Sequence, residues 1–159
     1  MTATGGIGWD SHRLVDGRPL VLGGVEIPFG RGLEGWSDAD VLTHAVIDAV
    51  LGAAALGDIG QHFPDDDPRW RGADSLELLG AVVALLGERR VTVVHVDATV
   101  LMERPKLAPH RDAIRARLSR ALGLDADHVN VKASTGEGMG FVGRGEGVAA
   151  LAVATVERP

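Results

Sequence analysis

The chain has 159 residues, which favours one domain over residues 1–159, with a sizeable core and no second catalytic module. Apolar residues make up 45% and charged residues 24%, as in ordinary globular proteins, and the formal net charge of −6 argues against nucleic-acid binding. The sequence has no cysteine, which excludes disulfides, thiolate metal sites and a cysteine nucleophile, so any metal ion must bind histidine or carboxylate side chains.

Glycine-bounded apolar runs near the N-terminus predict short strands. The first covers Ile7–Trp9 and follows a glycine pair. Two more runs, Leu20–Leu22 and Val25–Ile27, flank Gly23–Gly24, which is a typical two-residue hairpin turn. Pro28 and the glycines after it predict a loop.

The next segment predicts a helix that is apolar over most of its surface. Ser37 or Asp38 is a suitable N-cap, the helix runs to about Leu56, and Gly57 ends it. Such a helix should be largely buried. Its apolar stretch is shorter than the ~20 residues that cross a membrane, and the N-terminus lacks the basic and apolar regions of a signal peptide, so we expect a cytoplasmic protein.

The second half of the chain alternates helices and strands. Residues 57–72 are dense in Gly, Pro and Asp and predict a loop. The remaining elements, in chain order, are a helix from Asp74 to about Leu86 ended by Gly87, a strand over Val91–Leu101, a helix from about Pro109 to Leu122 ended by Gly123, a strand over Val129–Lys132, a glycine-rich loop over Gly136–Gly147 and a final strand over Val148–Val156. Three helices beside mostly adjacent strands predict an α/β (α+β) fold, a two-layer sandwich with a mixed β-sheet and three helices on one face.

Asp10, His12 and His44 form the first group of candidate ligands. Asp10 and His12 lie two apart in an extended segment, so their side chains point to one face, and His44 lies early in the buried helix. Three such ligands would bind a zinc-like ion and leave its fourth position open, as in catalytic sites. Asp40 and Asp48 lie four residues either side of His44, and one of them could orient its imidazole. The alternative is that the D-x-H pattern occurs by chance and that His44 is a buried histidine whose hydrogen bonds are satisfied within the core.

Three further polar segments lie in loops or at strand ends. The acidic segment 58–67 could bind a cation or hydroxyl groups, although turn capping is the commoner role. Lys106 follows the long strand and suits either a phosphate or a solvated charge. Ser134 and Thr135, followed by glycines, offer donors to phosphate, and Glu137 could hold Mg²⁺ together with substrate phosphates. With the first group, they describe a two-metal site for a phosphorylated, nucleotide-like substrate.

Five ordered motifs now identify a family resemblance. In chain order they read G-I-G-W-D-S-H-R, W-S-D-A-D-V-L-T-H-A, L-G-D-I-G-Q-H-F-P-D-D-D-P, R-P-K-L and V-K-A-S-T-G-E-G-M-G-F-V-G-R-G-E-G. Their order and spacing resemble those of the 2-C-methyl-D-erythritol 2,4-cyclodiphosphate synthases, and the resemblance covers essentially the whole chain.

The resemblance implies a metal-dependent phosphorus–oxygen lyase of the non-mevalonate isoprenoid pathway. In its reaction the 2-phosphate of 4-diphosphocytidyl-2-C-methyl-D-erythritol 2-phosphate attacks the β-phosphate of the same molecule and expels CMP. Asp10, His12 and His44 match the ligands of a Zn²⁺ ion, and Glu137 matches the residue that holds Mg²⁺ or Mn²⁺ with the substrate phosphates. Two cations suit phosphoryl transfer, which needs mainly positioning and charge neutralisation. A homotrimer with active sites between neighbouring subunits is also implied.

Matching positions imply a set of substrate contacts. They are Asp10 and His12 beside the metal; Asp58 and Gly60 at the ribose and erythritol; Phe63, Pro64, Asp65, Asp66 and Asp67 in a mobile loop; Met102, Arg104, Pro105 and Lys106 around the cytidine, with Lys106 near phosphate; Ser134 and Thr135 at the phosphates; and Phe141 and Arg144 at the substrate or a central channel. The implied catalytic residues are Thr135, which matches a position that stabilises the transition state, together with Trp36 and Ser37.

Two positions depart from the family pattern. Trp36 stands where many members carry a histidine that stabilises the transition state, and an indole has one donor and cannot become cationic. Either that role is dispensable, or Trp36 packs on the methylerythritol while Ser37 keeps the phosphate contact. Gly136 replaces a common threonine near the phosphates. We expect an active, slower enzyme; the alternatives are a non-catalytic protein that binds a cytidine nucleotide or an isoprenoid diphosphate, and a general metal-dependent phosphohydrolase.

Overall fold

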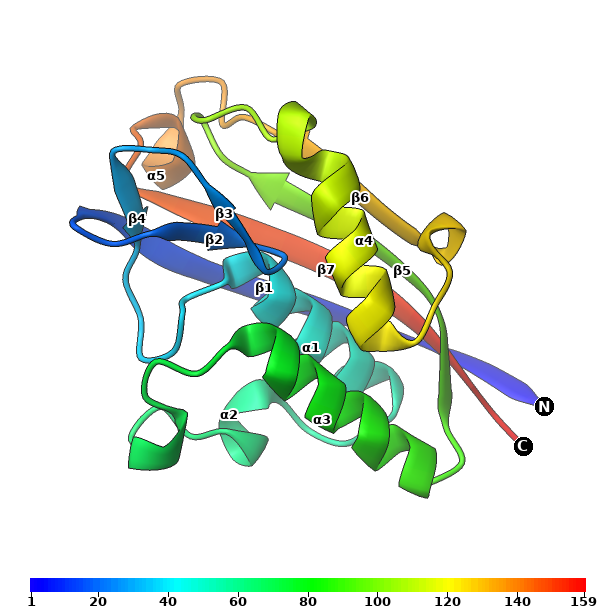
Figure 1. Ribbon diagram of the computed structural model, residues 1–159. Helices are drawn as coiled ribbons and strands as arrows, with labels where there is room; N and C mark the ends of the chain where they lie inside the picture. Colours follow the sequence, from blue (N-terminus) through cyan, green and yellow to red (C-terminus); the bar gives the residue numbers. More distant parts are fainter.

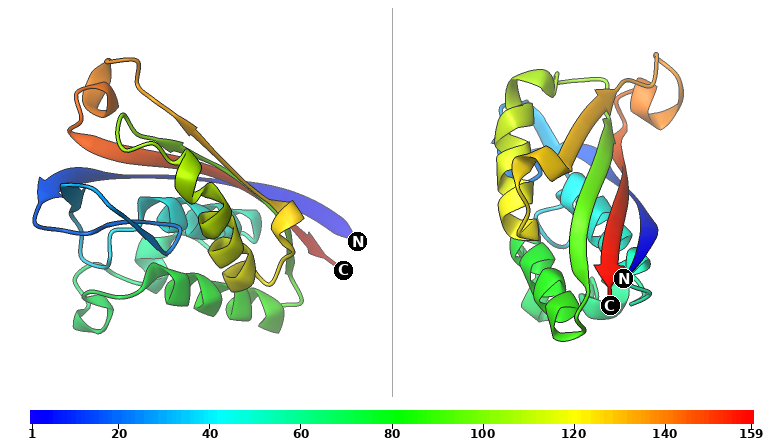
Figure 2. Two further views of the ribbon diagram at one scale, coloured as in Figure 1. Left: turned by 45° about the horizontal axis from the view of Figure 1, so that its top comes forward. Right: turned by 90° about the vertical axis from the view of Figure 1, so that its right-hand side faces the viewer.

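A five-stranded mixed sheet carries three helices on one of its faces in the computed structural model, which describes residues 1–159 (Figure 1). The strand order is β4-β1-β7-β5-β6, in which only β5 and β6 are parallel. The right-hand view of Figure 2 shows the three long helices gathered on the same side of the sheet. The predicted two-layer α+β fold with a mixed sheet is therefore confirmed.

The observed elements differ from the predicted ones mainly at their ends. The strands are β1 (Thr2–Asp16), β2 (Leu20–Leu22), β3 (Val25–Ile27), β4 (Arg31–Leu33), β5 (Thr92–Leu101), β6 (Val129–Ser134) and β7 (Gly147–Arg158). The helices are α1 (Val41–Ala53), α2 (Ile59–His62), α3 (Ser75–Glu88), α4 (Arg111–Leu122) and α5 (Gly140–Gly143), with 3₁₀ turns at Pro68–Trp70, Ala108–His110 and Ala126–His128. Strand β4 and the short helices α2 and α5 lie in segments that the sequence predicts as loops.

Strand β1 is far longer than the predicted Ile7–Trp9, because its glycines serve helix packing rather than a turn. A Cβ atom on Gly8 would lie 1.9 Å from the backbone oxygen of Ala45, and one on Gly6 would lie 2.2 Å from the backbone oxygen of Ala49. Helix α1 therefore packs backbone to backbone against β1, and only glycine permits this approach. The whole strand pairs antiparallel with β7, which places the two chain ends side by side (Figure 1).

Replacing Gly8 by alanine is expected to lower the free energy of unfolding by roughly 1–3 kcal/mol, because the new methyl group overpacks the contact with α1. Gly5→Ala is the matched control on the same strand, since a Cβ there would meet its nearest atom at 3.8 Å. Urea unfolding followed by circular dichroism measures both variants. Equal stability of the two variants would contradict the proposed contact.

Helix α1 begins later and ends earlier than predicted. Its N-cap is Asp40, whose carboxylate accepts hydrogen bonds from the N–H and the hydroxyl of Thr43, so neither Ser37 nor Asp38 is the cap. The same buried carboxylate accepts the N–H groups of Gly23 and Gly24, which ties the predicted β2–β3 hairpin to the helix. Both glycines have positive φ, as a type I′ turn requires. Almost all of α1 is buried, which confirms that prediction.

Two predicted helix ends also change. Helix α1 stops at Ala53, before Leu56, and the chain reverses through Ala55 with a φ of 58° rather than at Gly57. Helix α3 passes through Gly87 to Glu88, although its predicted cap Asp74 is correct and accepts the N–H of Leu76. The end of α4 is as predicted, with Gly123 in the left-handed conformation.

The two faces of the sheet differ in burial. Between the sheet and the helices lies one core of mainly Val, Leu, Ile and Ala side chains. On the opposite face, Ile7, Trp9 and Val153 are 67%, 52% and 47% exposed. These three side chains belong to the adjacent strands β1 and β7, so they form an apolar patch on the outer face. No helix has the length and apolar character needed to span a membrane.

Candidate metal and substrate site

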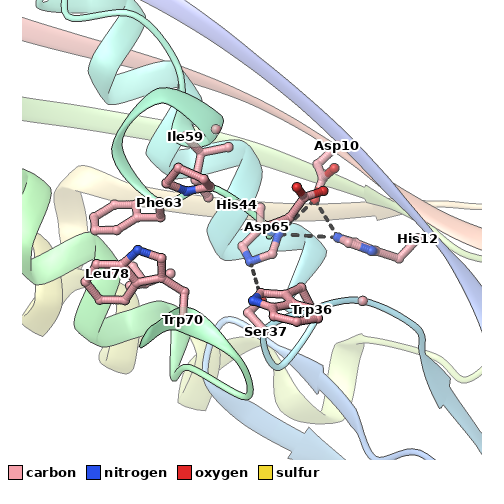
Figure 3. A pocket seen from close by; sticks show the side chains of 13 residues that line it. Asp10, His12, Trp36, Ser37, His44, Ile59, Phe63, Asp65, Trp70 and Leu78 are labelled. Carbon is pink, nitrogen blue, oxygen red and sulfur yellow. Dashed lines mark hydrogen bonds and ion pairs between the residues drawn. The ribbon is translucent and has the colours of Figure 1, made fainter. Parts of the chain in front are cut away.

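Three candidate ligands from two elements converge at one point. Asp10 and His12 project from β1, and His44 projects from α1, which packs on that strand (Figure 3). Oδ2 of Asp10 lies 2.8 Å from Nε2 of His12 and 3.0 Å from Nδ1 of His44, and these two nitrogens are 3.3 Å apart. The close approach of β1 and α1 at Gly8 and Ala45 brings these residues together.

Each imidazole binds a second group through the nitrogen that faces away from this point. Nδ1 of His12 lies 2.8 Å from the carbonyl oxygen of Glu34, which can only accept, so this nitrogen carries a proton. Nε2 of His44 lies 2.8 Å from the hydroxyl of Ser75. Such outer partners fix the orientation of metal-binding histidines.

The donor set fits a tetrahedral zinc ion. With metal–nitrogen bonds of about 2.0–2.1 Å, two ligand atoms of a tetrahedral zinc ion lie about 3.3 Å apart. The separations between the three donor atoms, 2.8, 3.0 and 3.3 Å, are close to this value. One carboxylate and two imidazoles supply three ligands and leave a fourth position for water or a substrate oxygen, which is the pattern of a catalytic site.

The same contacts shift the pKa values of the metal-free group. Burial raises the pKa of Asp10, but the hydrogen bonds and charges of His12 and His44 outweigh burial and lower this pKa to about 2. For His12, burial lowers the pKa, but the hydrogen bond and charge of Asp10 outweigh it, so the pKa lies above its usual 6.5. A proton on Nε2 of His12 therefore occupies the position that a metal ion would take.

Metal binding should consequently release protons at low pH. Below the raised pKa of His12 the metal-free site holds a proton that zinc must displace, so zinc affinity falls as the pH falls through that pKa and is constant above it. Asp10, with a pKa of about 2, stays ionised throughout. Calorimetric titration at pH 6 in two buffers of different ionisation enthalpy measures the number of protons released. The same count in His128→Ala, which alters an exposed histidine, is the control. No release at pH 6 would contradict this prediction.

The predicted partners of His44 are wrong. Asp40 accepts from the hairpin and from Thr43, and Asp48 accepts the N–H of Ile59 at 2.7 Å, so neither carboxylate contacts the imidazole. Four-residue spacing brings side chains to one face of a helix. Here the backbone N–H groups of neighbouring loops take up both carboxylates.

A pocket of about 380 Å³ adjoins the three ligands. Polar groups of the ligands and of Ser37 form one wall, and apolar side chains form the other (Figure 3). Beyond the three ligands, the lining residues are Gly35, Trp36, Ser37, Ile59, Gly60, Phe63, Pro64, Asp65, Trp70 and Leu78. The predicted residues Trp36, Ser37, Gly60, Phe63, Pro64 and Asp65 thus share the pocket with the ligands.

Trp36 has its single donor in use. Its indole N–H donates to the carbonyl oxygen of Asp67 at 3.0 Å, its carbonyl accepts the N–H of Gly72, and the guanidinium of Arg71 lies 5.7 Å from its ring centre. Trp36 therefore joins its own loop to the loop that follows α2. Its ring lines the pocket, but its N–H donates to the protein backbone and is not available to a molecule bound there.

A second pocket, of about 240 Å³, lies at the ends of β5 and β6. Of the predicted residues, it is lined by Met102, Pro105, Lys106, Ser134 and Thr135. Glu103, which sequence analysis did not select, also lines it and accepts the N–H of Gly136, so it holds the loop after β6. No residue lines both pockets.

Seven predicted residues line neither pocket; they are Asp58, Asp66, Asp67, Arg104, Glu137, Phe141 and Arg144. Asp58 caps α2, and Asp67 caps the following 3₁₀ turn and pairs with Arg69, so turn capping applies to both. Arg144, on the loop beside α5, pairs with Glu146. The roles of these residues stay predictions.

Comparison with known proteins places this geometry in a family. The model of the YgbB family matches residues 4–157. The chain belongs to the YgbB family. The resemblance seen in the sequence motifs is thereby confirmed.

Several curated relatives of this YgbB-family chain share one name. It is 60% identical over 152 residues to the 2-C-methyl-D-erythritol 2,4-cyclodiphosphate synthase of Salinibacter ruber, covering 96% of this chain and 97% of that protein. A solved 2C-methyl-D-erythritol-2,4-cyclodiphosphate synthase in its CDP-bound form superposes with a TM-score of 0.88 at 41% identity, covering 96% and 99% of the two chains. The bifunctional IspDF of Campylobacter jejuni superposes with a TM-score of 0.95 at 39% identity. The superposition covers 99% of this chain and 43% of the IspDF chain.

Sequence analysis missed the polar residues behind the ligands of this YgbB-family site. Ser75 reaches His44 from the first residue of α3, and Asp38 accepts the Ser75 hydroxyl. Neither residue has a helical or strand spacing to the ligands, because three separate segments meet here. The motif W-S-D-A-D places Asp38 near His44 in the chain, but its partner Ser75 is 37 residues away.

Proposed function

We propose that this chain is a metal-dependent phosphorus–oxygen lyase, which converts 4-diphosphocytidyl-2-C-methyl-D-erythritol 2-phosphate into 2-C-methyl-D-erythritol 2,4-cyclodiphosphate and CMP in the isoprenoid pathway. The observation that carries the proposal is the convergence of Asp10, His12 and His44 beside a pocket, with one ligand position open. The names of the relatives support the substrate and the product.

In this reaction an oxygen of the substrate 2-phosphate forms a bond to the β-phosphorus, and the bond from that phosphorus to the bridging oxygen breaks. CMP departs with the bridging oxygen and the electron pair. No side chain has to act as the nucleophile, because the attacking oxygen belongs to the substrate itself. The chain's task is to bind, orient and neutralise the phosphates.

We assign the ligands as follows. Asp10, His12 and His44 would hold Zn²⁺, and Glu137 would hold Mg²⁺ or Mn²⁺ together with the substrate phosphates. When bound, these cations supply the positive charge that polarises the phosphate under attack and stabilises the leaving group. Ser37 and Thr135 would donate their hydroxyl protons to phosphate oxygens, and Lys106 would add a charge at the second pocket.

A homotrimer would complete the site. The two pockets share no residue, although the substrate must span a metal centre and a cytidine pocket. The apolar patch of Ile7, Trp9 and Val153 on the outer face of the sheet is a surface that a neighbouring subunit would cover. Glu137, Phe141 and Arg144 would then contribute from the loop after β6. We propose a cytoplasmic location, as the lack of a spanning helix allows.

Incubation of the purified protein with substrate, Zn²⁺ and Mg²⁺, followed by mass spectrometry, tests the proposal. We expect CMP and a cyclic diphosphate in equal amounts, and no product after chelation of the metals. Recovery of intact substrate at saturating metal would refute the activity. A linear product with free phosphate would instead indicate a phosphohydrolase.

One observation favours a second candidate, a non-catalytic binding protein for a cytidine nucleotide or an isoprenoid diphosphate. The indole N–H of Trp36 is bonded to Asp67, so this residue offers no donor to a transition state. Turnover in Trp36→His but not in the natural chain would support the binding protein. Turnover in both would exclude it.

A further inference from the structure

Ser75 is a fully buried serine that the proposed reaction does not use. It is the first residue of α3, and its Oγ lies 2.8 Å from Nε2 of His44 on α1. On its other side, both its hydroxyl and its backbone N–H donate to the carboxylate of Asp38. A continuous hydrogen-bond chain thus leads from the Asp38 carboxylate to a metal ligand.

The direction of these hydrogen bonds follows from what each group can donate. A carboxylate only accepts, so the single hydroxyl proton of Ser75 points to Asp38. The oxygen of Ser75 can then only accept from the imidazole, which places the ring proton of His44 on Nε2. In the metal-bound site, Nδ1 of His44 is thereby left with a free lone pair for the ion, whereas without the ion this nitrogen makes the hydrogen bond to Asp10.

We propose that Asp38 and Ser75 are positioning residues that hold His44 in the tautomer and orientation needed to bind the metal ion. The inference rests on the metal site of the proposed function and adds a pair of residues to it. A carboxylate that accepts from the serine also draws electron density toward the imidazole, which makes Nδ1 a stronger ligand.

Ser37 reaches the same nitrogen but fits a different role. Its Oγ lies 3.1 Å from Nε2 of His44, and it accepts the N–H of Ala39 at 3.2 Å. Ser37 also lines the pocket, so its hydroxyl proton can point to a ligand there. Ser75, in contrast, has no exposed surface and no other acceptor than Asp38, so it is the permanent partner of His44.

Zinc affinity of Ser75→Ala tests the inference directly. Loss of a supporting hydrogen bond typically weakens metal binding 10–100-fold, and we expect a loss of about this size in a chelator competition assay. Asp38→Asn should weaken binding less, because a neutral amide oxygen still accepts from the serine. Because the two residues act in series, the double variant should bind zinc no more weakly than Ser75→Ala alone.

Ser119→Ala is the matched control. Ser119 is also a buried serine on a helix, but its hydroxyl donates to the carbonyl of Ala116, away from the site. Its replacement should leave zinc affinity unchanged. Thermal unfolding of every variant shows whether the fold is retained. If Ser75→Ala unfolds at a much lower temperature than the natural chain, the zinc affinity of Asp38→Asn alone tests the inference, because Asp38 makes no hydrogen bond to His44.

A spectroscopic readout separates positioning from packing. In zinc-loaded protein labelled with ¹⁵N-histidine, we expect a slowly exchanging Nε2–H signal from His44, which is lost in Ser75→Ala and kept in Ser119→Ala. Zinc affinity of Ser75→Ala equal to that of Ser119→Ala, or additive losses in the double variant, would overturn the inference. Tight zinc binding without a cyclic product would refute the proposed function and leave the inference standing.

Discussion

His44→Ala is expected to lose tightly bound zinc and most turnover while the fold survives. One of three ligands disappears, so the loss of zinc affinity should exceed the roughly 10–100-fold that follows from losing only a supporting hydrogen bond. The imidazole makes its hydrogen bonds only to side chains of the site, so its removal leaves the hydrogen bonds of the α1 backbone in place. Turnover at fixed Zn²⁺ should fall on the order of 10²–10³-fold or more, as when a group that stabilises transition-state charge is removed.

Elemental analysis and the mass-spectrometric assay measure both effects, and circular dichroism checks the fold. His128→Ala, which alters an exposed histidine on a 3₁₀ turn, is the control and should keep its zinc. Wild-type zinc content in His44→Ala would contradict the ligand assignment.

Mixed oligomers of two inactive variants are expected to regain activity. His44→Ala damages the first pocket and Thr135→Ala the second, and each should be nearly inactive alone. We expect each active site to combine the first pocket of one subunit with the second pocket of its neighbour. A trimer that contains both variants then has one subunit boundary at which an intact first pocket meets an intact second pocket. Trimers purified through two different affinity tags should therefore show about one third of wild-type activity.

The control mixes His44→Ala with Asp10→Ala, which damage the same pocket. Every subunit of these mixed oligomers lacks one ligand of the first pocket, so no active site is complete. They should stay inactive. A mixture of His44→Ala and Thr135→Ala that is no more active than its parts would contradict a site shared between subunits.

Sequence patterns predicted the layers of the fold because those depend on local signals. The apolar period of α1, the glycine pair of the hairpin and the β-branched run of β5 each act over a few residues. The length of β1 could not be predicted, since the glycine pair that ends at Gly6 marks a strand boundary until the position of α1 is known. The cap of α1 at Asp40 likewise depends on a hairpin that lies earlier in the chain.

The candidate site divides in the same way. The metal ligands could be selected from the sequence because D-x-H on a strand points two donors to one face and His44 lies early in a buried helix, and the family motifs then matched all three. The partner of His44 could not be selected, because Ser75 belongs to another helix and is an ordinary residue at a helix start. Nor does any spacing rule assign a residue to the first or to the second pocket. That assignment requires the folded structure, in which the ends of β5 and β6 form the second pocket.

The backbone contact between β1 and α1 has a consequence for redesign of this scaffold. Gly8 is two positions from Asp10, and Ala45, whose oxygen it meets, follows His44 directly. A side chain added at Gly8 would push the helix away from the strand, and would thereby separate His44 from Asp10 although neither ligand had been mutated. Libraries that aim at new metals or reactions should keep Gly8 fixed and vary the apolar wall of the pocket at Ile59 and Phe63, whose side chains are only partly buried.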